Sequence, residues 1–197
     1  MREISETEAE RHRAKMVRRK EVQDAEVDSK TEERGLLIVN TGPGKGKSTA
    51  AFGLALRMLG HGRRVGIVQF IKGAWHTGEK DALARFGDQV EWHAMGGGFT
   101  WETQDLARDI AAARRAFDKA KELMPDPTIG LVILDELNIA LRYDYLDLDE
   151  VVATLVARQP GLHVVVTGRN AKDKLAEMAD LVTEMGSVKH HFCAGVK

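Results

Sequence analysis

The sequence has almost no cysteine and no long apolar run. Cys193 is the only cysteine among the 197 residues, so no disulfide can form within the chain, as is usual in a reducing cytoplasm. No apolar run approaches the ~18 residues of a membrane span, and the N-terminus lacks the apolar core of a signal peptide. We therefore expect a cytoplasmic protein that does not associate with membranes.

An excess of charge of either sign is also missing. The chain carries 29 Lys and Arg against 30 Asp and Glu, for a formal net charge of -1, which argues against a generally basic nucleic-acid-binding protein. Its 43% hydrophobic and 6% aromatic content is ordinary for a globular protein, and its length suits about one domain. One enzyme-sized domain with no nucleic-acid partner is therefore expected.

A charged arm precedes the rest of the chain. Residues 1–34 hold 9 Lys and Arg and 10 Asp and Glu, and Arg11–Lys20 carries six basic residues and no acidic one. A solvated or disordered arm is one interpretation, because so charged a segment has little apolar surface to bury. The other is a weakly amphipathic helix that forms a lid over a site or contacts a partner subunit. We expect this arm over residues 1–34 and a separate domain over residues 35–197.

From residue 35 onwards, short apolar runs alternate with helical patterns. The runs are rich in Val, Ile and Leu throughout, which is typical of central parallel strands buried on both faces. The alternation predicts a mostly parallel α/β sheet with helices on both faces. The expected strands are 35–40, 65–71, 130–135 and 163–167, with weaker candidates at 90–95 and 181–185. The expected helices are 48–59, 79–86, 103–124, 148–158 and 171–178.

A glycine-rich turn joins the first strand to the first of these helices. It reads Thr41-Gly-Pro-Gly-Lys-Gly-Lys-Ser48, with Thr41 where the common phosphate-loop pattern has its first glycine, so the loop is one residue short. Its N–H groups, the helix N-terminus and Lys47 would bind phosphate, whereas a glycine turn with chance lysines is the alternative. The fold class expected is a P-loop NTPase of RecA-like type. The expected nucleotide-binding residues are Thr41, Gly42, Pro43, Gly44, Lys45, Gly46, Lys47, Ser48, Thr49 and Arg169.

Acidic residues follow the strand at 130–135. Asp135 and Glu136 would lie at the carboxyl edge of the sheet, where open α/β sheets bind ligands. Together with the Ser48 hydroxyl they are candidate Mg²⁺ ligands, although Asp135 could instead cap a helix. Arg169 ends another strand at this edge and could reach a phosphate or be merely solvated. These residues support a Mg-ATP enzyme without specifying its reaction.

Further motifs resemble one family. The segments Val68-Gln-Phe-Ile-Lys-Gly73, Gly98-Phe-Thr-Trp-Glu-Thr103, Leu134-Asp-Glu-Leu137 and Val188-Lys-His190, together with the short loop, resemble the P-loop type of ATP:corrinoid adenosyltransferase. The resemblance runs from about Gly35 to Lys197. Two alternatives remain open, namely a RecA-like enzyme that hydrolyses ATP or transfers phosphoryl groups, and a non-catalytic module that binds nucleic acid through the basic arm.

The resemblance implies an unusual use of ATP. In this family the Co(I) of a corrinoid attacks the ribose 5′-carbon and displaces tripolyphosphate, so no general base is required. Mg²⁺ and a catalytic Lys47 would neutralise the leaving group. Phe99 and Trp101 would lie against the corrinoid and displace its lower axial ligand, which makes Co(II) easier to reduce. Trp75 and Glu79 would contact the corrinoid, and Gln69 would lie nearby without an assigned role.

The resemblance also implies partners. It gives the arm a use as a helix that covers the corrinoid site, within a homodimer. A separate reductase must supply Co(I), because the sequence has no cysteine pair or flavin motif. The adjacent His190 and His191 would point to opposite sides of a strand, so we do not expect them to ligate one metal together.

Overall fold

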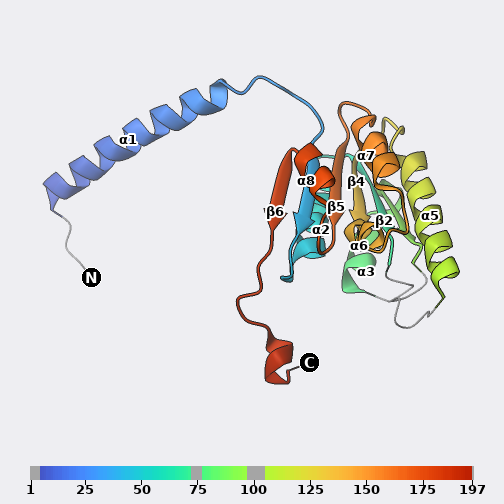
Figure 1. Ribbon diagram of the computed structural model, residues 1–197. Coiled ribbons are helices and arrows are strands. Elements are labelled where there is room, and N and C mark those ends of the chain that lie inside the picture. Colours follow the sequence, from blue (N-terminus) through green and yellow to red (C-terminus); the bar gives the residue numbers. More distant parts are fainter. Residues whose placement is uncertain (1–4, 72–76, 97–104, 197) are drawn as a thin grey trace. The chain divides into compact units, whose positions relative to one another are not determined.

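The computed structural model describes residues 5–71, 77–96 and 105–196 (Figure 1). By its internal contacts the chain divides into two units, Met1–Glu33 and Arg34–Lys197. The first contains α1 (Glu6–Asp28), whose N-terminus is closed by a capping box. In it the Ser5 hydroxyl accepts a hydrogen bond from the Glu8 N–H, and the Glu8 carboxylate accepts one from the Ser5 N–H.

The second unit is built on a six-stranded sheet with the order β3-β2-β4-β5-β1-β6 (Figure 1). Its strands are β1 (Leu37–Thr41), β2 (Arg64–Gln69), β3 (Val90–Ala94), β4 (Ile129–Asp135), β5 (His163–Thr167) and β6 (Leu181–Glu184). All five described pairings are parallel, so all six strands end at the same edge. The α/β fold class and each of the expected strands are confirmed, with ends that shift by one or two residues.

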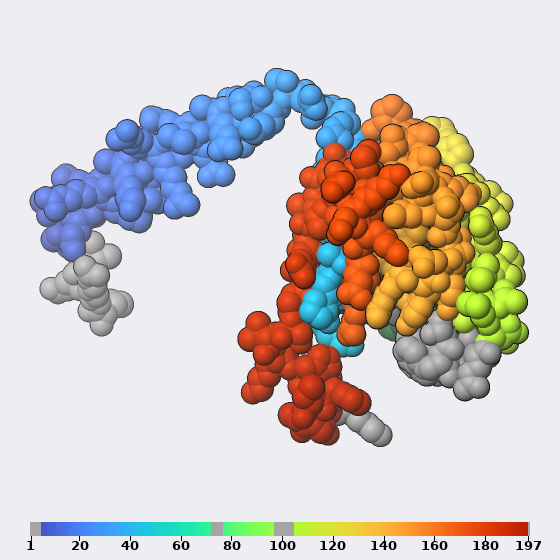
Figure 2. All heavy atoms as spheres, in the orientation of Figure 1, coloured from blue at the N-terminus to red at the C-terminus, as the bar shows by residue number. Residues whose placement is uncertain are grey.

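Helices cover both faces of the sheet because successive strand residues point to opposite sides. In β1, Leu37 and Val39 join one core cluster and Ile38 joins the other. The first face is covered by α5 (Leu106–Leu123), α6 (Leu137–Arg142), α7 (Leu148–Val156) and α8 (Asp173–Met178), and the second by α2 (Lys47–Gly60) and α3 (Gly78–Ala84). Figure 2 shows the atoms of α7 and α8, orange to red-orange, closing over the first face.

Two differences from the sequence-based expectation concern helices. The short α6 was not among the expected helices, and the alternative that Asp135 caps a helix is wrong, because the N-cap residue of α6 is Glu136 and Asp135 is fully buried. The helix α5 begins at Leu106 rather than at residue 103, since the Asp105 side chain caps it by accepting the Arg108 N–H. Short 3₁₀ turns lie at Gly87–Gln89 and His191–Ala194. Among the helices in the described part of the chain, none combines the length and the apolar character needed to cross a membrane.

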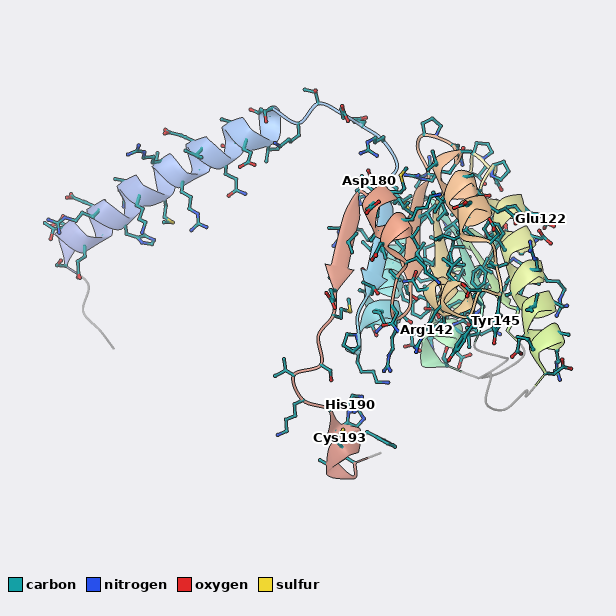
Figure 3. The ribbon with its side chains drawn as sticks, viewed as in Figure 1. Glu122, Arg142, Tyr145, Asp180, His190 and Cys193 are labelled. Carbon is teal, nitrogen blue, oxygen red and sulfur yellow. The ribbon has the colours of Figure 1, made fainter. Side chains whose placement is uncertain are left out.

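An ion pair and hydrogen bonds hold the start of β1 in place, at the edge of the sheet where the strands begin. Asp180 accepts a hydrogen bond from the Leu37 N–H at 2.7 Å and pairs with Arg34 at 2.6 Å. The Arg34 hydrogen bond, followed by that of the Leu37 N–H, lowers the pKa of Asp180. Arg158 donates to the Gly35 carbonyl at 3.0 Å. Asp180 lies far from Arg142 and Tyr145 in the stick view, at the other end of the sheet (Figure 3).

His163 lies at the same edge of the sheet, at the start of β5, where it acts as a neutral hydrogen-bond acceptor. Its Nδ1 accepts a hydrogen bond from the Leu36 N–H at 3.2 Å, which requires an unprotonated nitrogen. Burial, and then the positive charges of Arg158 and Arg63, lower the pKa of His163 from its ordinary value. Protonation of Nδ1 would therefore break the hydrogen bond from the Leu36 N–H and add a positive charge beside Arg158 and Arg63.

We expect His163 to make the protein less stable in mild acid. The unfolded chain takes up a proton on His163 near the ordinary pKa of 6.5, before the folded chain does, so the free energy of unfolding falls as the pH drops below that value. Urea unfolding at about pH 7 and about pH 5.5 measures the loss. In His163→Asn, which keeps an acceptor but cannot be protonated, the loss should be smaller, and an equal loss in both proteins would contradict the assignment.

Candidate functional site

The phosphate loop lies between the end of β1 and the start of α2. Gly42 and Gly46 adopt left-handed backbone conformations, with φ of 92° and 106°, which L-residues rarely adopt. The Lys47 side chain is buried, and its amino group donates hydrogen bonds to the carbonyl oxygens of Gly42, at 2.8 Å, and Gly44. The loop thus wraps around a fixed positive charge at a helix N-terminus, an arrangement suited to polyphosphate.

Asp135 is the centre of the site. Its side chain is fully buried at the end of β4. Oδ1 accepts hydrogen bonds from the Ser48 hydroxyl and the Thr167 hydroxyl, both at 2.7 Å, and Oδ2 accepts one from the Gln69 amide at 2.9 Å. The structure therefore brings together two expected Mg²⁺ ligands, Ser48 and Asp135, although they lie 87 positions apart in the sequence.

Glu136 follows in a strained conformation. Its φ of 64° is in the left-handed region, and it is the N-cap residue of α6 without a side-chain capping bond. Its N–H donates to the Thr167 hydroxyl at 3.0 Å, so Thr167 joins both acidic residues to β5. Strained residues of this kind cluster at functional sites.

The turn that carries Arg169 is hydrogen-bonded to the start of the phosphate loop. Its neighbours Gly168 and Asn170 have φ of 127° and 55°. The Asn138 amide donates to the Gly168 carbonyl at 3.0 Å, and the Thr41 hydroxyl accepts from the Ala171 N–H at 3.1 Å. Arg169 is exposed on this turn, beside the end of β1.

A segment that the sequence did not indicate closes one side of the loop. The Met185 carbonyl accepts a hydrogen bond from the Gly44 N–H at 2.6 Å, and the Met185 N–H donates to the Thr41 carbonyl at 2.9 Å. A Cβ added at Gly44 would lie 2.3 Å from the Gly186 carbonyl oxygen. We call Met185–Gly186 the β6 strap. Gly44 is therefore required by the packing of the strap, independently of any role in phosphate binding.

Other expected site residues are more peripheral or lie outside the described part. Glu79 is exposed in the first turn of α3, and Pro43, Lys45 and Thr49 are exposed around the phosphate loop. Phe99, Trp101 and Trp75 lie outside the described residues. No role in this list is tested by the structure, so each stays a prediction.

The expectation for the adjacent histidines was wrong in its geometry. The rings of His190 and His191 stack with centroids 4.7 Å apart, because this stretch enters a 3₁₀ turn and does not continue a strand. Within the described part of the chain, no group of three or more His, Cys, Asp or Glu side chains is placed to hold a metal ion.

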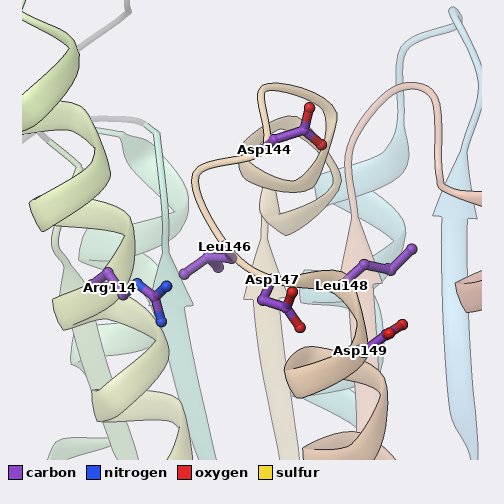
Figure 4. A pocket seen from close by; sticks show the side chains of 6 residues that line it. All are labelled: Arg114, Asp144, Leu146, Asp147, Leu148 and Asp149. Carbon is purple, nitrogen blue, oxygen red and sulfur yellow. The ribbon is translucent and has the colours of Figure 1, made fainter.

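A hollow of about 430 Å³ lies beside the start of α7, away from the phosphate loop (Figure 4). Two of its three carboxylates are paired with cations, Asp144 with Lys172 at 3.1 Å and Asp149 with Lys174 at 2.6 Å. None of the expected site residues lines it. Its lining residues are Arg114, Asp144, Leu146, Asp147, Leu148 and Asp149.

The comparison with protein families decides between the alternatives left open above. Residues 33–197 match the family model described as ATP:corrinoid adenosyltransferase BtuR/CobO/CobP. The chain belongs to this family. The resemblance drawn from the motifs is thereby confirmed. A second model, described as cob(I)alamin adenosyltransferase N terminal, matches residues 4–27, which include most of α1.

Curated relatives of this adenosyltransferase family member span nearly its whole length. The corrinoid adenosyltransferase of Pseudomonas aeruginosa is 55% identical over 188 residues, which cover 95% of this chain and 93% of the relative. That of Sinorhizobium is 53% identical, covering 98% and 91%, and that of Escherichia coli K12 is 48% identical, covering 95% of each chain. A solved structure, the flagellar accessory protein FlaH of Methanocaldococcus jannaschii, aligns with 12% identity and a TM-score of 0.49 over 77% of this chain and 71% of that chain.

We expect Gly44→Ala to disrupt the phosphate loop of this adenosyltransferase family member. The new methyl group would overlap the Gly186 and Met185 carbonyl oxygens, at 2.3 and 2.6 Å, so the β6 strap must move. ATP binding measured by calorimetry should weaken about tenfold or more. Gly53→Ala is the matched control, since a Cβ there meets no atom within 4 Å and alanine favours the helix interior. Wild-type ATP affinity in Gly44→Ala would contradict the role of the strap.

Proposed function

We propose that this protein transfers the 5′-deoxyadenosyl group of ATP to the Co(I) centre of a corrinoid, in the synthesis or salvage of adenosylated corrinoids. The observation that carries the proposal is the cradle around Lys47 beside the Ser48–Asp135 pair, in a chain of the ATP:corrinoid adenosyltransferase family. The relatives' name supports the substrate class, and the geometry of the cradle is suited to a triphosphate.

The reaction needs stabilisation of its leaving group and does not need a general base. The cobalt supplies an electron pair to the ribose 5′-carbon, the Co–C bond forms, and the C5′–O bond breaks with its electrons passing to tripolyphosphate. No proton has to be removed from the nucleophile. The protein's task is to hold the triphosphate and stabilise the charge that develops on it, which suits Lys47 and the N–H groups of the loop.

The donors around Ser48 suit Mg²⁺. The Ser48 hydroxyl lies 2.7 Å from the Asp135 carboxylate, and both are hard oxygen donors. Mg²⁺ bound with ATP commonly takes few protein ligands, with phosphate and water completing its shell. We propose that Ser48, Asp135 and Glu136 hold the ion, directly or through water. When bound, Mg²⁺ would neutralise charge on the triphosphate.

The remaining roles are proposed from the family resemblance. Phe99 and Trp101 would contact the corrinoid and displace its lower axial ligand, with Trp75 and Glu79 nearby. The match of residues 4–27 to an adenosyltransferase N-terminal model supports a role for the arm as a lid. We further propose a cytoplasmic homodimer that receives electrons from a separate reductase.

An anaerobic assay tests the reaction. Mg-ATP is mixed with chemically reduced cob(I)alamin or cobinamide, and the corrinoid spectrum is followed together with the phosphate products. We expect a light-sensitive alkylcobalt spectrum and one tripolyphosphate for each corrinoid converted. ADP with no change in the corrinoid would overturn the proposal in favour of a RecA-like ATPase.

We expect Lys47→Ala to lose activity in this assay. The buried ammonium is the fixed charge of the cradle, and removal of such a stabilising group lowers rates by about 100-fold or more. Lys119→Ala, which removes an ammonium paired with Glu122 on α5, is the control and should behave as the wild type. Adenosyl transfer at an unchanged rate in Lys47→Ala would remove Lys47 from the mechanism.

We expect Trp101→Ala to separate ligand displacement from ATP binding. ATP affinity should stay near the wild-type value, because the aromatic side chain is assigned to the corrinoid. Conversion should slow much more when the assay starts from Co(II) and a reductant than when it starts from prereduced Co(I). Equal slowing in both assays would contradict the assignment of Trp101 to ligand displacement.

A further inference from the structure

The side-chain amide of Gln69 uses both of its ends inside the protein. Gln69 is only 5% exposed at the end of β2. Its Nε2 donates to Asp135 Oδ2 at 2.9 Å, and its Oε1 accepts from the indole N–H of Trp92 at 3.1 Å. An ionised carboxylate can only accept a hydrogen bond and an indole can only donate one, so a single orientation of the amide satisfies both neighbours.

This fixed amide determines how Asp135 is turned. Gln69 pairs in register with Asp135 across β2 and β4, and it takes up Oδ2. The other oxygen, Oδ1, is left to Ser48 of the phosphate loop and to Thr167 of β5. Since β2 and β5 are the two neighbours of β4 in the sheet, the carboxylate is held from both sides.

Trp92 connects the same amide to the helix of the phosphate loop. It lies on β3 and packs against Phe52 of α2, with ring centroids 5.3 Å apart. The helix α2 begins with Lys47 and Ser48. Trp92 therefore contacts both the amide that holds Asp135 and the helix that carries the partner hydroxyl of Asp135.

We propose that Gln69 and Trp92 are positioning residues for the Mg²⁺ of the nucleotide site. Trp92 orients the Gln69 amide, and Gln69 turns Asp135 so that Oδ1 faces Ser48. Neither residue contacts ATP or the corrinoid in this role. The inference rests on the proposed function only in taking Mg-ATP as the bound substrate.

The test measures the Mg²⁺ requirement of ATP binding in the full-length protein, without corrinoid. Calorimetry with ATP at increasing free Mg²⁺ gives the concentration for half-maximal binding, and a titration with a chelator gives the Mg²⁺-free affinity. In Gln69→Leu the Mg²⁺ requirement should rise about tenfold, as is typical when a partner of a metal ligand is removed. The Mg²⁺-free affinity for ATP should stay unchanged.

Trp92→Phe keeps a ring against Phe52 but removes the N–H. We expect a smaller rise in the Mg²⁺ requirement, about fivefold, as for loss of one hydrogen bond. The double variant should resemble Gln69→Leu alone, because Trp92 acts through Gln69 and the two effects are therefore not additive. If Gln69→Leu does not fold, Trp92→Phe alone still decides the matter.

Phe52→Leu is the matched control, because it alters the packing of Trp92 and leaves every hydrogen bond of Asp135 in place. It should change thermal stability with no change in the Mg²⁺ requirement. An unchanged Mg²⁺ requirement in Gln69→Leu, fully additive effects, or an equal fall in Mg²⁺-free affinity would overturn the inference. Failure of the corrinoid assay would overturn the proposed function only, since the Mg²⁺ titration contains no corrinoid.

Discussion

The site depends on one buried carboxylate. Asp135 has no exposed surface, and burial of an ionised group without partners would cost several kcal/mol. Its hydrogen bonds to Ser48, Thr167 and Gln69 offset that cost, but only if α2, β5 and β2 all stand in their observed places around β4. The hydrogen bonds that offset the cost of burying the Asp135 carboxylate therefore also join the phosphate loop to the centre of the sheet.

The phosphate loop meets two requirements at once. Its glycines at positions 42 and 46 give the turn its left-handed conformations. The lack of a side chain at Gly44 also lets the β6 strap approach so closely that a methyl group there would overlap the backbone of Gly186. The Gly44 N–H donates to the Met185 carbonyl, so this N–H of the loop is already used within the protein.

How much of this structure the sequence predicted depends on whether a feature arises from neighbouring residues or from residues far apart in the sequence. The central strands and the phosphate loop were predicted because their patterns are local, with continuous apolar runs and glycines before a helix. The helix α6 was missed because it has six residues and starts at the left-handed Glu136 without a capping side chain. Asp135 and Arg169, which follow two of the expected strands, indicated the correct edge of the sheet, but nothing in the sequence indicated that Gln69 and Thr167 both bind Asp135. Their common partner could not be predicted, because it depends on the order of the strands.

The position of the β6 strap in the sequence determines when the phosphate loop can be completed as the chain is synthesised. The phosphate loop is synthesised well before Met185 and Gly186, which follow it far along the sequence. Until they arrive, the Gly44 N–H lacks its acceptor and the Thr41 carbonyl lacks its donor. A nascent chain can therefore pair its inner strands first, but its phosphate loop is completed only after residues 185 and 186 have been made and have left the ribosome.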